Sequence, residues 1–263
     1  QEEITKEALR IREEFISVAA HELRTPLTTL YARLQLVERR LARPDLDPAL
    51  VLRDVTLVHQ AADRLKILID RLLDISRIRS GQLQLERGQT DVAAMVGSFV
   101  SMLAETSGRQ IAMPAPDSPE SYRVAVDAVR MEEVAVNLID NALKYSPADT
   151  AIDVELASTP DAIRIAVRDR GPGIRMAERA RIFEPFHRSS PSGAPGVGLG
   201  LHIAREIVEL HGGSLTVETP TDGGSRFRCR ETQTREACPR ATGNPSSGNR
   251  AARRSRGAGA TAS

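Results

Sequence analysis

Apolar residues recur at helical spacing through the first part of the chain. Over residues 4–18 they are separated by steps of four and three positions, and the same spacing returns over residues 23–41. This period is typical of helices with one apolar face, as in coiled coils. The step between the two stretches is five positions, so their apolar faces are out of phase. We expect one long helix over residues 4–42, which Pro26 interrupts and bends after this change of phase.

A second helix is predicted after a short turn. Asp47 is a favourable N-cap and Pro48 a favourable first helical residue. Apolar residues then recur at alternating steps of four and three: Val51, Val55, Val58, Ala62, Leu65, Ile69 and Leu72. Two such helices predict an antiparallel hairpin, and we expect two copies to bury its apolar faces in a four-helix bundle. A coiled-coil spacer without chemistry would show the same pattern.

The pattern changes after residue 80, where we expect a hinge near residues 79–82. Apolar and polar residues alternate over residues 83–85 as in a short strand, and Asp91 can cap a helix that ends near Glu105. Further strands are predicted over 122–126, 152–156 and 163–167, and further helices over 128–143 and 200–211. The expected fold is therefore a helical hairpin over residues 1–80 and a two-layer α/β sandwich over 83–230, with helices against one mixed sheet.

The end of the chain lacks the residues that build a core. After Phe227 there is no Val, Ile, Leu, Met, Phe or Tyr, so residues 226–233 predict only a weak strand that closes the edge of the sheet. We expect residues 231–263 to form a disordered tail. Its six Arg and two Glu are scattered without aromatic residues, which favours a solvated tail over a nucleic-acid-binding arm.

Composition sets further bounds. Hydrophobic residues make up 41% of the 263 positions, and the charged residues nearly cancel at a net charge of +1, so no global field for nucleic acid is expected. The two cysteines form no disulfide framework or metal-ligand pattern, which favours a reducing compartment. No apolar run reaches the roughly 20 residues needed to span a bilayer, and no signal peptide opens the chain. Because Gln1 already lies within a heptad pattern, we expect the cytoplasmic, catalytic end of a longer protein, with any membrane attachment before it.

Candidate chemistry begins at His21, within the sequence FISVAAHELRTPL. His21 lies outside the apolar face in either phase, so we expect its side chain to be exposed. A lone surface histidine usually has no catalytic role. The adjacent Glu22, however, can orient a neutral imidazole and accept its proton, which makes the ring nucleophilic.

The HELRTPL segment closely resembles the phosphoacceptor box of sensor histidine kinases. The resemblance implies a homodimer in which His21 is the phosphoacceptor and Glu22 is its acid/base neighbour. It also implies that Thr25 positions water when the partner protein is dephosphorylated. Thr25 can otherwise be a structural residue that caps the bend before Pro26.

The second half of the chain contains a pair of asparagines at helical spacing. Asn137 and Asn141 are one turn apart in VNLIDNALKYS, so their amides project from one face, with Lys144 and Tyr145 after them. A buried asparagine can simply be a satisfied polar group of the core. Amide oxygens also suit Mg²⁺, which accepts few protein ligands and leaves the rest of its shell to phosphate and water.

Two further segments carry candidate site residues. Asp169 precedes Gly171 and Gly173 after a strand, and on its own this pattern is equally an ordinary turn. Phe183 and Phe186 are three residues apart in IFEPFHR. We expect the two rings to form a small hydrophobic anchor that pins a mobile lid.

A glycine-rich segment leads directly into the last predicted helix. Gly196, Gly198 and Gly200 can present backbone N–H groups to an anion beside the helix N-terminus. A dinucleotide-binding fold would use a similar pattern, but here no isolated strand precedes the glycines and no acidic ribose partner follows them. The stretch before Gly198 is rich in Ser, Gly and Pro, which predicts a flexible lid over a triphosphate.

These four motifs, in this order behind HELRTPL, resemble the Bergerat-type ATP-binding domain of histidine kinases over roughly residues 10–230. By this resemblance, Asn141 ligates Mg²⁺, Lys144 meets phosphate, Asp169 accepts the adenine amino group, and Arg188 reaches for the γ-phosphate. The glycines let the backbone approach the base and the phosphates.

The activity implied is ATP-dependent phosphorylation of His21, transfer to an aspartate of a response regulator, and dephosphorylation of that regulator. Two other classes are alternatives, and the HELRTP segment together with the absence of a large middle domain argues against the first of them. Chaperone- and topoisomerase-type ATPases share the nucleotide fold and use a catalytic glutamate, for which Glu133 stands one turn before Asn137. A non-enzymatic dimeric scaffold is the third class, and the intact nucleotide motifs argue against it.

Overall fold

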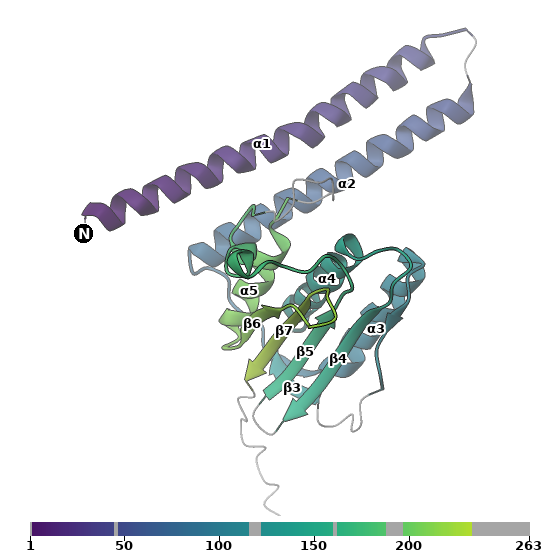
Figure 1. The fold of residues 1–263 in the computed structure, drawn as a ribbon. Helices are drawn as coiled ribbons and strands as arrows, with labels where there is room; N and C mark the ends of the chain where they lie inside the picture. Colours follow the sequence, from purple (N-terminus) through teal and green to yellow (C-terminus); the bar gives the residue numbers. More distant parts are fainter. Residues whose placement is uncertain (1, 45–46, 116–121, 160–161, 188–196, 233–263) are drawn as a thin grey trace, which may run out of the picture.

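The computed structural model describes residues 2–44, 47–115, 122–159, 162–187 and 197–232. Two long helices, α1 (Glu2–Leu41) and α2 (Pro48–Arg79), run antiparallel and extend away from an α/β unit (Figure 1). The carboxylate of Asp47 accepts a hydrogen bond from the Ala49 backbone N–H at 2.9 Å, so Asp47 caps α2 as predicted. The helical hairpin is therefore confirmed. None of the described helices combines the length and apolar composition needed to cross a membrane.

The prediction that Pro26 interrupts the first helix is wrong, since α1 continues through it. A proline removes only one main-chain donor from the helix, and the turns on both sides remain intact. Hydroxyl groups bond to neighbouring carbonyls in this region: Thr28 Oγ1 donates to Arg24 O at 2.8 Å, and Thr29 Oγ1 donates to Thr25 O at 3.1 Å. Packing against α2 also holds α1 as one helix.

Part of the apolar face predicted for α2 is exposed in the single chain, as expected for a face that a second hairpin would cover. The buried residues of α2 are Asp54, Ala61, Leu68, Ile75 and Ile78, whereas Ala62 and Ile69 of the predicted face are exposed. Apolar positions cover a broad arc of this helix, and α1 and the α/β unit together cover only one side of it. The buried Asp54 carboxylate is neutralised by Arg40, whose Nε lies 3.1 Å from it.

The described part of the α/β unit contains three α-helices, a five-stranded mixed sheet and a two-stranded sheet. The helices are α3 (Val92–Ser107), α4 (Ala128–Tyr145) and α5 (Gly200–Leu210). The five strands, in spatial order, are β2 (Ile111–Ala112), β4 (Ile152–Thr159), β5 (Ala162–Arg168), β7 (Arg226–Thr232) and β6 (Ser214–Glu218), and only β2 and β4 are parallel. The helices lie on one face of this sheet (Figure 1), so the two-layer sandwich is confirmed.

Several details of this unit differ from expectation. No strand forms over residues 83–85, and β1 (Gly88–Asp91) instead pairs with β3 (Arg123–Val126) in a separate small sheet. The weak strand expected at the edge is β7, which lies inside the sheet between β5 and β6. Its inward residues Phe227, Cys229 and Glu231 are buried. Hydrogen-bonded pairing of β7 with both β5 and β6 thus compensates for its weak apolar pattern.

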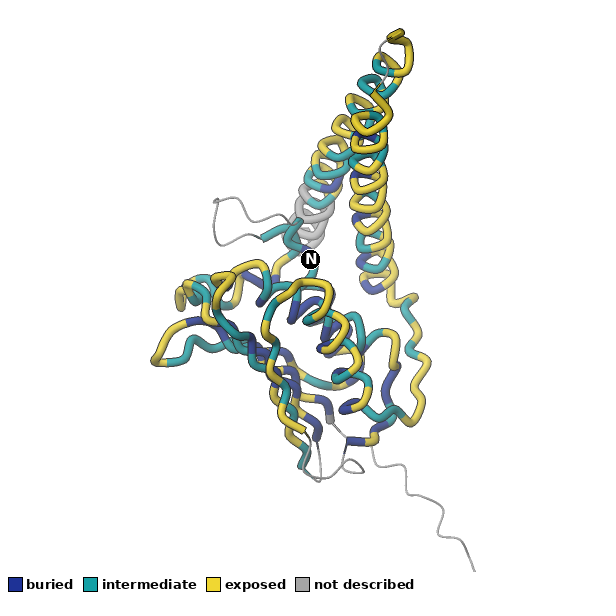
Figure 2. Tube along the Cα trace, turned by 90° about the vertical axis from the view of Figure 1, so that its right-hand side faces the viewer, coloured by how far each residue is buried: buried dark blue, intermediate teal, exposed yellow. Residues whose placement is uncertain are grey.

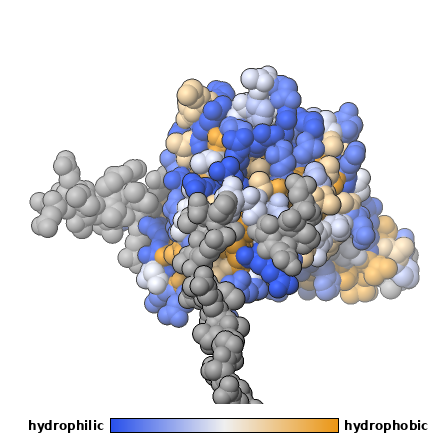
Figure 3. All heavy atoms as spheres, turned by 90° about the horizontal axis from the view of Figure 1, so that it is seen from below, coloured by the Kyte–Doolittle hydropathy of each residue, from blue (hydrophilic) through white to orange (hydrophobic). Residues whose placement is uncertain are grey.

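The core of the protein lies between the five-stranded sheet and its helices. Figure 2 shows buried positions concentrated in the α/β unit, whereas most of the hairpin is exposed. Met131 and Leu138 of α4, Ile165 of β5 and Phe227 of β7 are among the fully buried side chains. The face seen from below in Figure 3 is mainly hydrophilic, with small apolar patches. The core thus fixes α4 and α5 beside the ends of the strands, where the site described next is found.

Candidate nucleotide-binding site

A cavity of about 360 Å³ lies between α4, the turn after β5 and the start of α5. Most of the predicted nucleotide-site residues line it: Asn137, Asn141, Lys144, Tyr145, Asp169, Gly173, Gly198 and Gly200. Gly171 lies beside the cavity, in the same turn as Asp169. Gly196 and Arg188 are outside the described residues. Segments far apart in the sequence therefore meet in one concave site.

The asparagine helix α4 forms one wall. Asp127 caps it by accepting a hydrogen bond from the Arg130 backbone N–H at 3.1 Å. Asn137 is only 6% exposed, and a Cβ added at Gly200 would come within 2.9 Å of its Oδ1. Glycine therefore allows the start of α5 to lie against the amide. On the same helix, the Lys144 ammonium forms an ion pair with Asp140, four residues earlier.

Asp169 is held at the back of the cavity. The residue is 2% exposed, and its Oδ1 accepts hydrogen bonds from the backbone N–H groups of Gly171 at 2.7 Å and Ser225 at 3.2 Å. Burial raises the pKa of Asp169, and these two hydrogen bonds act in the opposite direction. A Cβ at Gly171 would lie 2.6 Å from the carbonyl oxygen of Tyr145. The close turn is therefore possible only with glycine.

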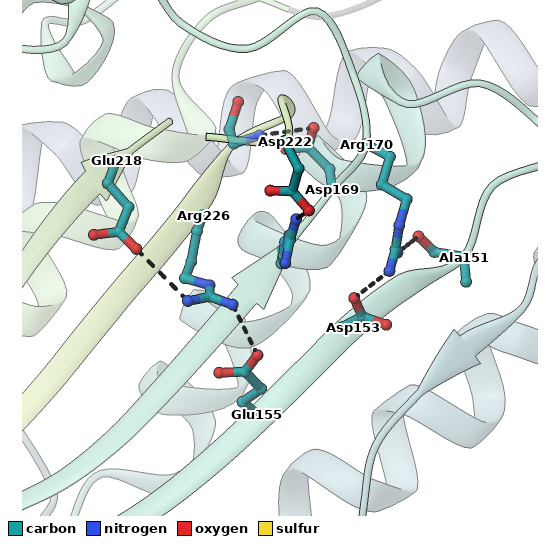
Figure 4. Close-up of polar contacts among 10 residues, drawn as sticks. Ala151, Asp153, Glu155, Asp169, Arg170, Glu218, Asp222 and Arg226 are labelled. Carbon is teal, nitrogen blue, oxygen red and sulfur yellow. Dashed lines mark hydrogen bonds and ion pairs between the residues drawn. The ribbon is translucent and has the colours of Figure 1, made fainter. Parts of the chain in front are cut away.

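Ion pairs join the strands around this aspartate on the outer face of the sheet (Figure 4). Arg226 of β7 reaches its neighbour β6 and, across β5, also β4: Nη1 lies 3.7 Å from Glu218 of β6, and Nη2 lies 3.1 Å from Glu155 of β4. Arg170 Nη2 lies 2.8 Å from Asp153 of β4. Exposed pairs of this kind contribute little stability individually. Their geometric effect is to connect β4, β6, β7 and the turn after β5 at the end of the sheet that carries the site.

The segment expected to anchor a lid contacts both parts of the protein. Phe183 ends the short helix η3 (Arg181–Phe183), which follows η2 (Met176–Glu178), and its ring is buried. Phe186 does not join this core in the same way, because its ring lies 5.3 Å from the ring of Phe15 on α1. The two phenylalanines therefore have different environments: one packs inside the α/β unit and the other reaches the hairpin.

The predicted acceptor group lies apart from the cavity. His21 and Thr25 are exposed on α1, and Glu22 is half-buried. None of the three is among the residues that line the cavity. The hydroxyl of Thr25 donates to the His21 carbonyl oxygen at 3.4 Å, which is long for a hydrogen bond.

Sequence reasoning missed Arg71 and His187 in the cavity wall. Arg71 belongs to α2, and its Nη2 donates to Asn137 Oδ1 at 3.3 Å. Its spacing of three and four residues from Leu68 and Ile75 is the one sequence signal that places it on an inward face. His187 directly precedes the predicted Arg188, and nothing in its sequence context indicates a ligand.

Glu133, the alternative catalytic residue, does not line the cavity. Its carboxylate accepts a hydrogen bond from Arg130 Nη1 at 2.9 Å, and Arg130 Nη2 lies 3.1 Å from Asp74 of α2. Burial raises the pKa of Glu133. The group is thus part of an ion-pair cluster between α4 and the hairpin, which argues against a chaperone-type role for it.

Two family models match the chain, and together they span the hairpin and most of the α/β unit. One is the His Kinase A (phospho-acceptor) domain, over residues 11–81. The other is the Histidine kinase-, DNA gyrase B-, and HSP90-like ATPase, over residues 126–234. The chain belongs to the sensor histidine kinases. This histidine kinase core has the two domains in the order expected from the sequence motifs.

Known relatives agree with this assignment. The sensor protein KdpD of Escherichia coli is 33% identical over 229 residues, which cover 87% of this chain and 25% of KdpD. The sensor histidine kinase MtrB of Mycobacterium leprae is 36% identical over 225 residues, which cover 83% of this chain and 39% of MtrB. The chain thus spans less than half the length of these relatives.

A solved structure shares the fold. It is the histidine kinase ThkA in complex with the response regulator protein TrrA, with a TM-score of 0.63 and 22% sequence identity. The alignment covers 87% of this chain and 64% of the ThkA chain.

Proposed function

We propose that this histidine kinase core transfers the γ-phosphoryl group of ATP to His21 and then to an aspartate of a response regulator. The observation that carries the proposal is the cavity in which the asparagine helix, the buried Asp169 and the glycine segment before α5 meet. This cavity belongs to an ATPase-type domain that directly follows a phospho-acceptor-type hairpin with an exposed histidine.

ATP fits the chemistry of the cavity wall. Asp169 offers a buried carboxylate oxygen to the adenine amino group, because its Oδ1 already accepts two backbone N–H groups. Gly198 and Gly200 bring backbone close to the opposite wall at the N-terminus of α5, where phosphate is favoured. Lys144 supplies a positive charge from α4. The base and the phosphates would thus contact different ends of the cavity.

The residues present also fit Mg²⁺ bound together with ATP. This ion commonly takes one or two protein oxygens and completes its octahedral shell with phosphate and water. Asn141 lines the cavity and offers an amide oxygen of this kind. When bound, the ion would neutralise charge on the phosphates. We assign Asn141 as its protein ligand.

The chemical step at His21 requires a neutral imidazole. One ring nitrogen attacks the γ-phosphorus of ATP, the bond from this phosphorus to the β,γ-bridging oxygen breaks, and ADP leaves. Glu22 accepts the proton from the other ring nitrogen. In the second step an aspartate carboxylate of the regulator attacks the same phosphorus and the imidazole leaves with its proton restored. We assign to Thr25 the positioning of a water that hydrolyses the regulator's acyl phosphate.

A homodimer is supported by the surface of the hairpin. Leu27, Leu34 and Leu41 recur every seven residues on α1, yet they are 54%, 39% and 56% exposed in the single chain. A second hairpin would bury this stripe in a four-helix bundle. ThkA, which shares the fold, is found in complex with a response regulator, and we propose the same class of partner here.

We propose residues 1–80 as the dimerisation and phosphotransfer domain and residues 83–230 as the ATP-binding domain. The end of α2 at Arg79 and its cap at Ser80 support the first boundary. Strand β7 continues to Thr232, two residues beyond the second, and residues 233–263 lie outside the described part. Because ATP is the phosphoryl donor, we place this core in the cytoplasm.

The proposal is tested by incubating the protein with Mg²⁺ and ATP labelled at the γ-phosphate. The labelled protein is then divided between acid and base. A phosphohistidine loses its label in acid and keeps it in base, which is the result we expect. A label that survives acid would place the phosphoryl group on a hydroxyl side chain and contradict the proposal.

A further inference from the structure

Arg71 brings a positive charge from the helical hairpin to the wall of the nucleotide cavity. It lies on α2, outside the 126–234 range of the ATPase match. Leu68 and Ile75, three residues before it and four after it, are buried in the core shared with the α/β unit. The spacing puts all three residues on one helix face. Burial of its two neighbours therefore holds Arg71 against the nucleotide domain.

The charge of Arg71 is not balanced by a carboxylate. Two other cations line the cavity, and each has an acidic partner: Lys144 pairs with Asp140, and Arg175 pairs with Glu178. The hydrogen bond of Arg71 goes instead to the neutral amide of Asn137, at 3.3 Å. Within the described ranges no carboxylate forms an ion pair with Arg71. A half-buried guanidinium without a counter-charge is suited to an anionic ligand.

Glu133 is the carboxylate that could act as a counter-charge for Arg71. The charge of Arg71 acts on it, but the hydrogen bond of its carboxylate is made with Arg130. Arg130 is in turn paired with Asp74, one turn after Arg71 on α2. The ion-pair cluster of Arg130, Glu133 and Asp74 is therefore complete without Arg71, and it fixes α2 against α4 beside the cavity.

A second observation points to a ligand in this cavity. The Nε2 atom of His187 is buried and has no hydrogen-bond partner among the described residues. His187 lines the same cavity as Arg71, and a Cβ at Gly198 would come within 2.7 Å of its carbonyl oxygen. Buried polar atoms are normally satisfied. An unsatisfied ring nitrogen beside the glycine segment therefore indicates a group that the bound state supplies.

We propose that Arg71 binds the β- and γ-phosphates of ATP, so that the helical hairpin completes the nucleotide site. This inference rests on the proposed function, because it takes the cavity as the ATP site. When ATP binds, the guanidinium exchanges the amide oxygen of Asn137 for phosphate oxygens, and Asn137 is released to face the nucleotide. A bound triphosphate then holds the α/β unit against α2. A nucleotide that lacks the two outer phosphates does not.

The test compares the affinities of the full chain for ATP and AMP in Mg²⁺, measured by calorimetry. We expect Arg71→Ala to lower the affinity for ATP about tenfold or more, since hydrogen bonds to charged groups are of this strength, and to leave AMP binding unchanged. The ATP affinity of Arg71→Lys should lie between those of the wild type and Arg71→Ala, because lysine keeps the charge but not the forked geometry of the guanidinium. The control is Arg64→Ala, an exposed arginine one heptad earlier on α2, which should match the wild type for both nucleotides.

Three results would overturn the inference. If Arg71→Ala binds ATP as tightly as the wild type, the phosphates do not contact Arg71. If it binds ATP more tightly, the Arg71 to Asn137 hydrogen bond competes with the nucleotide. Equal losses for ATP and AMP would make the role structural. A wild-type protein that binds no ATP would overturn the proposed function as well, whereas normal ATP binding and His21 labelling with an unaffected variant would overturn this inference alone.

Discussion

The ring of Phe15, six residues before His21 on α1, lies 5.3 Å from the ring of Phe186 with an interplanar angle of 53°. Phe186 has a φ of 63°, and it is the one described non-glycine residue with positive φ. Such a conformation costs about 1–2 kcal/mol, so surrounding contacts must hold it. Arg79 of α2 also lies over the Phe15 ring, 5.6 Å from its centroid. The pair therefore joins the segment after η3 of the nucleotide domain to the acceptor helix.

This contact predicts energetic coupling between the two rings. In a double-mutant cycle of Phe15→Ala and Phe186→Ala, the free energies of unfolding should deviate from additivity by about 0.5–1.5 kcal/mol, the range for aromatic pairs. Denaturant unfolding of the four proteins measures the coupling. Phe15→Ala combined with Phe99→Ala is the control, because Phe99 lies on α3, which packs against β1 and α4. Additive losses in the first cycle would show that the rings do not interact.

Asp169→Asn should reduce the preference for ATP over GTP. Oδ1 of the native carboxylate accepts from the backbone N–H groups of Gly171 and Ser225. An amide has one acceptor oxygen, so in the variant those N–H groups use it and the NH₂ group is left facing the adenine amino group. We expect ATP affinity to fall about tenfold or more, with a smaller loss for GTP. Competition binding measures both.

Asp222→Asn is the matched control for this variant. Asp222 is exposed in the turn between β6 and β7 and pairs with Arg168 of β5, so the preference for ATP should not change. Equal losses of ATP and GTP binding in Asp169→Asn would instead indicate misfolding of the turn.

Glu231 should make stability depend on pH. Burial raises the pKa of Glu231 from its ordinary value of 4.5 to about 8, while its hydrogen bond with Cys229 and the charge of Arg87 act in the opposite direction. The folded state thus keeps a proton that the unfolded state releases. The stability this provides is fully present below pH 4.5 and is lost as pH rises through about 8.

Glu231→Gln should remove this dependence. Relative to the variant, the wild type should lose on the order of a few kcal/mol of unfolding free energy between pH 5 and pH 8. Urea unfolding of both proteins at the two pH values measures the difference. Glu155→Gln, at an exposed position of β4, is the control and should parallel the wild type. If the unfolding free energies of Glu231→Gln and the wild type change equally between the two pH values, Glu231 is ionised in the folded protein.

The local features of this protein were predictable and the long-range ones were not. The caps at Asp47 and Asp91 and the shared face of Asn137 and Asn141 depend on residues within one or two helical turns. The contact between Arg71 and Asn137 joins residues 66 positions apart, so no local period signals it. In β7, pairing with two neighbouring strands overrides a sequence that resembles a polar tail.

Thr25→Ala should separate the two activities assigned to the hairpin. Autophosphorylation needs His21, Glu22 and ATP, whereas hydrolysis of the regulator's acyl phosphate needs a positioned water. We expect an unchanged rate of labelling and a dephosphorylation rate about tenfold lower or more, as for loss of one positioning group. Thr25→Ser keeps the hydroxyl and should restore the rate.

The control for this prediction is Thr28→Ala. Thr28 is exposed one turn later, and its hydroxyl donates to the Arg24 carbonyl oxygen at 2.8 Å, a shorter bond than that of Thr25. If hydroxyl bonding to the helix backbone were what matters, Thr28→Ala would impair both activities at least as much. Parallel losses of both activities in Thr25→Ala would make Thr25 a structural residue.

The measurement that tests the central claim most directly compares His21→Gln with His59→Gln. Both histidines are exposed on the hairpin, His21 on α1 and His59 on α2, and neither lines the nucleotide cavity. Each variant is incubated with Mg²⁺ and γ-labelled ATP, and its ATP affinity is measured in parallel. We predict that His21→Gln binds ATP normally and acquires no acid-labile label, while His59→Gln is labelled like the wild type. Acid-labile labelling of His21→Gln would contradict the account.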